Sequence, residues 1–416
     1  MRMVPGSFRA RVAMIVVAAM ALRLLYVLVL ARHVPMAGDA SFFHAEANLV
    51  AEGKGFIEPF VHTAYGIDVP TASHPPLYTL WLSLASLAGA DGLLEHRSLG
   101  ALTGGACIVV IALLGRRVGG DRVGLVAAGL AAVYPLLVAA DGALMSESLY
   151  GLLVASVLLV GLRMLERPAL GTAAAAGGLV GLAALTRGEA LLLLPLLVLP
   201  LALRGGGSGG RFARAALACV ACAVVLAPWT IRNASAFDRP TLIAHNDSTV
   251  LAGANCGPTY GGRDIGSWRF DCISERRTLR EGEQAARWRR EGIDYAREHP
   301  SRLVVVVPVR MLRTWDLYQP RRQVEFAESR AKWAQQAGVA AYFLLVPLAA
   351  VGALGLWRRA RPALLVLLSP AALVTISSAI GYGVPRFRHA FEPSLVVLAA
   401  LGVVALAERR RRAAAI

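Results

Sequence analysis

Long apolar runs alternate with short arginine-rich clusters along the whole chain. Ten runs are long enough or nearly long enough to cross a bilayer, which takes about 20 apolar residues in a helix. They lie near 12–31, 98–115, 123–140, 148–163, 170–186, 189–203, 213–229, 338–357, 362–380 and 391–407. Since only helices and closed barrels can span lipid, this pattern predicts an all-α polytopic membrane protein with a bundle of about ten transmembrane helices.

Two further apolar stretches, 76–90 and 301–319, are assigned by the distribution of arginines. If only the ten runs cross, the segments on the side of both termini hold eighteen arginines, and the short loops on the other side hold three. The positive-inside rule then places both termini in the cytoplasm. Counting 76–90 as a crossing would reverse the next six spans. Both stretches are therefore expected to be helices at the outer surface of the cell (inner or plasma) membrane.

This topology divides the chain into three parts. Residues 1–229 form an N-terminal transmembrane module with a first external loop at 32–97, residues 230–337 form a second external segment, and residues 338–416 supply the last transmembrane helices. Part of the second segment, 274–299, is charged and is expected to be helical up to His299-Pro300. The first apolar run is longer than the core of a signal peptide, so we expect it to be retained as a helix.

Composition narrows the functional classes. The chain is 56% hydrophobic and 17% charged, with a net charge of +16. Because its arginines flank the apolar runs, they indicate topology rather than binding to nucleic acid. Cys256 and Cys272 both fall in the second external segment, where the environment permits disulfides, and are predicted to pair.

The unusual polar residues gather on the external side. Asp39 follows the first span, where a carboxylate can act as a general base on a hydroxyl. Together with His44 and Glu46 it has the ligand chemistry for a divalent metal ion, although a solvated loop explains the same residues. His74-Pro75-Pro76-Leu77-Tyr78 stands at the start of the 76–90 stretch, where the prolines alone account for a rigid helix start.

Further charged residues flank the later spans. Asp141 and Glu147 bracket one external turn, and Arg187 with Glu189 forms another, where a local ion pair is the simpler alternative. Other basic residues at the outer boundary are Arg232, Arg386, Arg388 and His389. Arginine binds phosphate bidentately, so these positions suit the phosphate of an anionic lipid. Arg23 lies inside the first span, where a functional role and pairing with another helix are both plausible.

The order of these motifs resembles the GT-C superfamily of integral membrane glycosyltransferases, in the branch of protein O-mannosyltransferases and lipid A aminoarabinose transferases. The landmarks are Asp39, His74 to Tyr78, Glu147, Leu185-Thr186-Arg187 with Glu189, and Pro385-Arg386-Phe387. The resemblance implies transfer of a sugar from a polyprenyl-phosphate donor to an acceptor on the extracytoplasmic side. It also implies that Asp39 and Glu147 are catalytic acidic residues facing one cavity. The expected substrate-binding residues are His74, Tyr78, Arg187, Glu189, Arg232, Arg386 and His389.

The sequence leaves the acceptor open among glycans, lipids and proteins. The protein mannosyltransferases usually carry paired acidic residues in the first loop, whereas Ala40 follows Asp39 here. Two other functions remain possible: a transporter or flippase of lipid-linked glycans, and a non-catalytic scaffold in the cell envelope. A transporter would be expected to place its ionisable groups near the middle of the bilayer, but here they gather at the outer edge.

Overall fold

The computed structural model describes residues 6–36, 38–205, 207–274, 280–325 and 328–414. Within these ranges the chain is helical and contains no β-strand, only an isolated bridge between Ile57 and Pro70. The predicted all-α class is therefore confirmed. Arg2, used in the topology argument, and residues 275–279 of the predicted charged helix lie outside the described residues.

Every predicted span corresponds to helical structure in the folded chain. The elements are α1 (Phe8–Leu25) with its extension η1 and η2 (Tyr26–His33), α5 (Leu93–Val133), α6 (Pro135–Asp141), α7 (Glu147–Glu166), α8 (Leu170–Ala184), η3 (Gly188–Leu192), η4 (Leu194–Val198), α9 (Leu199–Ala202), α10 (Ser208–Ala236), α15 (Lys332–Arg359), α16 (Arg361–Ile380) and α17 (Glu392–Ala413). Six helical segments among the described residues are long and apolar enough to cross a membrane, namely those at 8–33, 93–133, 147–166, 208–236, 332–359 and 361–380. The remaining apolar helices are shorter or, like α17, end in a charged turn.

The element α5 contains two of the predicted spans. The backbone of Gly120 is left-handed (φ 80°), a conformation that glycine adopts without the steric penalty of a Cβ. A Cβ built on Gly115 would lie 3.0 Å from the Cα of Gly124, although nine residues of continuous helix would separate the two by about 13 Å. The chain therefore reverses at Gly120, and the predicted spans 98–115 and 123–140 are the two arms of a helical hairpin.

A buried ion pair joins the first span to this hairpin. Arg23 on α1 donates to Asp141 at the end of α6 over 2.5 Å, and both side chains are almost fully buried. Arg23 also donates to the carbonyls of Ala131 and Ala132. Of the two interpretations that the sequence left open for Arg23, the structure shows pairing with another helix.

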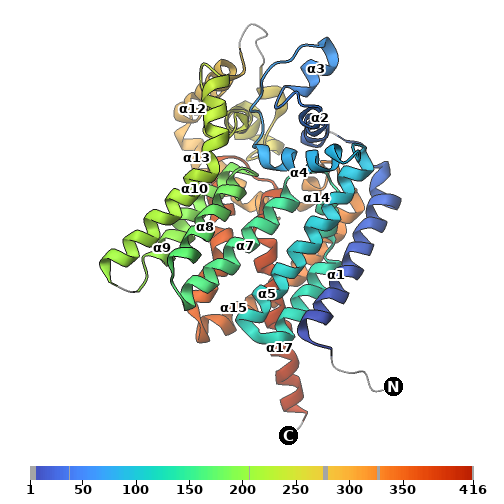
Figure 1. The fold of residues 1–416 in the computed structure, drawn as a ribbon, viewed down its shortest axis with the longest axis vertical. Coiled ribbons are helices and arrows are strands. Elements are labelled where there is room, and N and C mark those ends of the chain that lie inside the picture. Colours follow the sequence, from blue (N-terminus) through green and yellow to red (C-terminus); the bar gives the residue numbers. More distant parts are fainter. Residues whose placement is uncertain (1–5, 37, 206, 275–279, 326–327, 415–416) are drawn as a thin grey trace.

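Short helices gather at one end of the bundle, and both termini lie at the opposite end (Figure 1). The short helices are α2 (Asp39–Ala51), α3 (Pro59–Tyr65), α4 (Pro76–Leu87), α11 (Asn246–Ala254), α12 (Glu281–Glu298), α13 (Pro300–Thr314) and α14 (Pro320–Gln323). The helix α12 confirms most of the helix predicted at 274–299. The predicted Cys256–Cys272 disulfide is present in the same region.

Candidate functional site

A cavity of about 510 Å³ lies where these short helices meet the ends of the long ones. Its wall is mostly apolar, with a few charged groups, as is usual for ligand sites. The polar and aromatic lining residues are Asp39, Phe43, His74, Ser146, Thr186, Arg187, Glu189, Asn246, Asp247, Ser377, Tyr382, Arg386 and Phe387. Segments from four distant parts of the sequence, within 39–75, 146–192, 246–251 and 377–387, therefore share one wall.

Asp39 is the first residue of α2 and follows Gly38, whose backbone has a positive φ of 55°. Its carboxylate accepts a hydrogen bond from Arg386 Nη2 at 3.1 Å and lies 3.8 Å from His74 Nε2. Desolvation acts to raise the pKa of Asp39, but the charges of His74 and Arg386 outweigh it and leave the pKa below its usual value. Burial lowers the pKa of His74. Asp39 is therefore an ionised carboxylate at neutral pH, which is the form that a general base needs.

Glu147 is the first residue of α7 and is almost fully buried, with 1% of its side chain exposed. Three arginines surround it: Arg187 Nη1 at 3.1 Å, Arg386 Nε at 3.4 Å and Arg330 Nη2 at 3.7 Å. Glu147 does not belong to the cavity wall. It contacts Arg187 and Arg386, which line that wall, so its catalytic role stays a prediction.

Arg187 has the local partner that the sequence allowed and a second one besides. Its Nε donates to Glu189 at 2.7 Å, and its Nη1 donates to Glu147. The guanidinium also lies 5.2 Å from the ring centroid of Phe387, within the range of a cation–π contact. These contacts fix Arg187 in the cavity wall.

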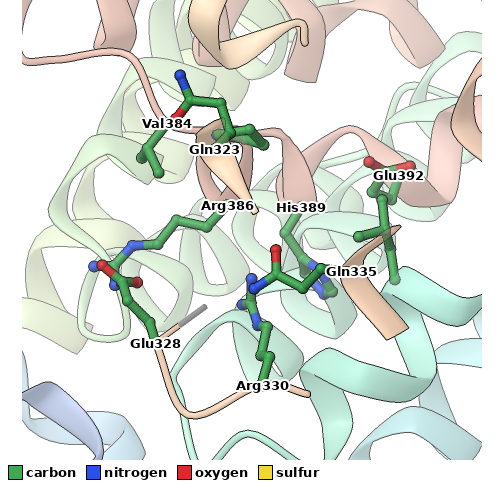
Figure 2. Close-up of a pocket in the computed structure, with 10 residues that line it drawn as sticks. Gln323, Glu328, Arg330, Gln335, Val384, Arg386, His389 and Glu392 are labelled. Carbon is green, nitrogen blue, oxygen red and sulfur yellow. The ribbon is translucent and has the colours of Figure 1, made fainter. Parts of the chain in front are cut away.

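Arg386 lines both the cavity and a small polar chamber of about 30 Å³, whose lining residues are drawn in Figure 2. The chamber contains Glu328, whose carboxylate pairs with Arg386 Nη1, and the side chain of Arg330. His389 also lines it. Burial, reinforced by Arg330, lowers the pKa of His389 to about 4, so this imidazole is neutral at physiological pH. The structure therefore places His389 in this chamber and outside the cavity wall.

Besides His389, two more predicted substrate-binding residues lie outside the cavity wall. Tyr78 is buried in a cluster with Phe43, at 5.0 Å between ring centroids. Arg232 donates to the carbonyls of Phe56 and Thr71 and stacks on Trp229, so it ties the first external loop to α10. Tyr78 and Arg232 therefore pack between the elements around the cavity and do not line it.

The proposed metal ligands Asp39, His44 and Glu46 are not brought together. No group of three His, Cys, Asp or Glu side chains with metal-binding geometry occurs in the described part of the chain. In a helix, positions 39 and 46 are two turns apart, about 10 Å along the axis. The ring of His44 contacts His96 at 3.0 Å between Nδ1 atoms. The prediction of a metal site from these three residues is therefore wrong.

Glu46 has a structural partner in place of a metal. Its carboxyl accepts a hydrogen bond from Thr79 at 2.6 Å, which joins α2 to α4. Burial raises the pKa of Glu46 to about 8. This residue is consequently a neutral carboxylic acid below that pH.

Sequence reasoning missed several residues of the site. Glu328 and Arg330 precede α15 in a stretch with no recognisable motif, and only folding brings them to Arg386 and Glu147. Tyr382 lines the cavity directly before the Gly383-Val384-Pro385-Arg386 segment. A tyrosine so close to a predicted phosphate-binding arginine was the one available signal.

Comparison with known proteins agrees with this architecture. Residues 73–231 match the sequence model of the dolichyl-phosphate-mannose-protein mannosyltransferase family. The fold is similar to that of the Archaeoglobus fulgidus oligosaccharyltransferase in its apo form, with a TM-score of 0.60 and 14% identity over 97% of this chain and 51% of that one. It is also similar to the same organism's enzyme AglB in complex with an inhibitory peptide and a dolichol-phosphate, with a TM-score of 0.56 and 14% identity over 98% and 52% of the two chains.

A third solved structure, ArnT from Cupriavidus metallidurans bound to undecaprenyl phosphate, aligns with a TM-score of 0.45 and 17% identity over 94% of this chain and 77% of that one. No curated protein sequence gives a significant match. The chain spans about half the length of the archaeal oligosaccharyltransferase. The fold is therefore similar to that of the archaeal oligosaccharyltransferase, which agrees with the predicted resemblance.

Proposed function

We propose that this protein, whose fold is similar to that of the archaeal oligosaccharyltransferase, transfers a sugar from a polyprenyl-phosphate donor to an acceptor hydroxyl. The observation that carries the proposal is the convergence of Asp39, Arg187 and Arg386 on one cavity at the end of the helices. A carboxylate and two guanidiniums are the groups needed to accept a proton and to bind a phosphate.

The donor class is supported by the position and the lining of the cavity. Its wall combines the arginines with apolar residues at the outer boundary of the predicted spans, which suits an amphipathic lipid phosphate. The archaeal AglB structure contains a dolichol-phosphate on the same fold. A nucleotide sugar offers no apolar tail for such a wall.

The reaction follows from the charges of the side chains. The acceptor oxygen attacks the anomeric carbon of the sugar while the Asp39 carboxylate takes the proton of the hydroxyl. The bond from the anomeric carbon to the phosphate oxygen breaks, and its electron pair stays on the phosphate. Arg187 and Arg386 stabilise the charge that develops there, a contribution that is often the largest single one in catalysis.

Glu147 acts in this scheme as a positioning residue. A buried carboxylate shared by three arginines restricts their rotamers and partly neutralises their mutual repulsion. The phosphate partners are then held in place before the donor arrives.

We infer that the cavity is extracytoplasmic. It lies at the end of the bundle opposite both termini, and the C-terminal helix ends in Arg409 to Arg412 on the terminal side (Figure 1). The positive-inside rule assigns such clusters to the cytoplasm.

One structure of the archaeal oligosaccharyltransferase is a complex with zinc and sulfate. Asp39 and His74 have the ligand chemistry for such an ion, but no group of three His, Cys, Asp or Glu side chains that could hold it occurs among the described residues, and Asp39 is paired with Arg386. We therefore assign no step to a metal. Transfer measured with and without a chelator tests this assignment.

The decisive experiment incubates the purified protein with a panel of polyprenyl-phosphate sugars and a cell-envelope extract that supplies acceptors. Transfer from at least one lipid donor, with none from the corresponding nucleotide sugar, is the expected result. Movement of intact lipid-linked glycan across a vesicle membrane without any transfer would instead establish the flippase alternative. If neither transfer nor transport is observed, the scaffold function remains.

A further inference from the structure

Arg386 is already paired with carboxylate side chains in this structure. Its Nη1 pairs with the carboxylate of Glu328, while Nη2 pairs with Asp39 and Nε faces Glu147. Figure 2 shows the side chains of Arg386 and Glu328 directed toward each other. Since arginine presents the same fork to carboxylate and to phosphate, Glu328 occupies a position that suits a phosphate oxygen.

The three carboxylates around Arg386 differ in how they are held. Asp39 and Glu147 are the first residues of helices α2 and α7. Glu328 lies instead in the connection between α14 and α15, and 38% of its side chain is exposed. Its backbone and that of Ser329 have positive φ angles of 35° and 61°. Such conformations are strained for residues other than glycine and often mark functional sites.

A second observation points to an anion at the same place. Arg330 is 8% exposed, its Nε and Nη2 atoms have no hydrogen-bond partner among the described residues, and Nη2 lies 3.7 Å from Glu147, beyond hydrogen-bond distance. Arg330 lines the chamber that contains Glu328 and Arg386. A buried guanidinium with unused donors is costly unless a ligand or water satisfies it.

The charges of the site permit one added anion in exchange for Glu328. The ion-pair network around Arg386 contains four carboxylates and three guanidiniums: Asp39, Glu147, Glu189, Glu328, Arg187, Arg330 and Arg386. It therefore has one negative charge in excess. When Glu328 swings into solvent the site becomes neutral, and a ligand with a single negative charge restores the original balance. A diphosphate would bring a second negative charge.

We propose that Glu328 is an internal counter-anion that occupies the phosphate position on Arg386 and is displaced by the donor, so that the site selects a phosphodiester with one charge over a diphosphate. This inference rests on the proposed function, because it assumes that the anion is the phosphate of a lipid-linked sugar. Glu328 is a specificity-determining residue in this scheme, and the unused donors of Arg330 receive the incoming phosphate.

The test measures binding, so that it needs neither a sugar nor an acceptor. Isothermal titration at pH 7.5 compares the wild type with Glu328→Gln, using farnesyl methyl phosphate, with one negative charge, and P1-farnesyl-P2-methyl diphosphate, with two. Glu325→Gln is the matched control, since Glu325 is exposed three residues earlier in the same connection. The thermal midpoint of each variant checks that the fold is unchanged.

The wild type and Glu325→Gln are expected to bind the phosphodiester more tightly than the diphosphate. Glu328→Gln should bind the phosphodiester about tenfold more tightly, since a charge-assisted hydrogen bond no longer has to be broken. Its affinity for the diphosphate should rise by more than that, because the displaced carboxylate stays on the same connection beside the site and repels two charges more strongly than one.

Unchanged or weaker binding of the phosphodiester by a folded Glu328→Gln would overturn the role of Glu328 and leave the proposed function standing. Failure of all three proteins to bind either probe, while sugar transfer from a polyprenyl-phosphate donor is observed, would also overturn it. Failure of binding and of transfer together would contradict the proposed function itself.

Discussion

Replacement of Asp39 by asparagine separates proton transfer from donor binding. Asparagine keeps an oxygen that can accept the 3.1 Å hydrogen bond from Arg386, and Arg386 retains its other two carboxylate partners. The phosphate-binding groups should therefore stay in place, and donor affinity should change by less than about tenfold. Loss of a general base lowers turnover by about 10²- to 10⁴-fold.

The assay is single-turnover transfer from a labelled polyprenyl-phosphate sugar, with donor affinity measured separately on the same protein. Asp91→Asn is the matched control, because Asp91 is exposed at the same end of the molecule and lies outside the cavity wall. Full turnover by Asp39→Asn would refute the assignment of the base. An equal loss of donor affinity and turnover would show that Asp39 acts through Arg386.

The pH profile gives an independent check on the same residue. The pKa of Asp39 is below its usual value, which is about 3.9 in unfolded peptides. The carboxylate is the active form, and it is lost only as the pH falls through the lowered pKa. The acid limb of kcat/KM should consequently lie below about pH 4, and an acid limb near pH 6 that is absent in Asp39→Asn would contradict this.

Three further predictions concern stability. The Glu46 carboxyl is neutral below about pH 8 in the folded protein, but in the unfolded chain it is ionised above about pH 4. Its contribution to stability is therefore lost as the pH rises between these two values. Glu46→Gln should raise the thermal midpoint at pH 8 more than at pH 5. The Cys256–Cys272 bond closes a loop of 16 positions. Its removal in the Cys256→Ser variant should lower the free energy of unfolding by about 3 kcal/mol, measured by denaturant titration. Asp141→Asn leaves Arg23 charged and buried and should destabilise by about 3–5 kcal/mol, whereas replacing both residues by leucine should recover most of that loss; no such recovery in a double-mutant cycle would contradict the pairing.

The sequence by itself determined the helical class and the positions of the helices. Each span contains enough apolar residues to define itself locally, and the arginine clusters order the spans across the membrane. Even the short helices α4 and α13 were located, because proline at their first positions marks a helix start. The pairing of Cys256 with Cys272 followed from their sharing one external segment.

Only the tertiary structure decided which charged residues meet. Asp39 and Arg386 are 347 positions apart and contact each other because α2 and η8 (Pro385–Ala390) lie at the same end of the bundle. No local pattern reports that proximity, so Glu328 and Arg330 went unnoticed. The same geometry surrounded Glu147 with three arginines and set His44 against His96, since the direction of a helical side chain depends on how the whole helix packs.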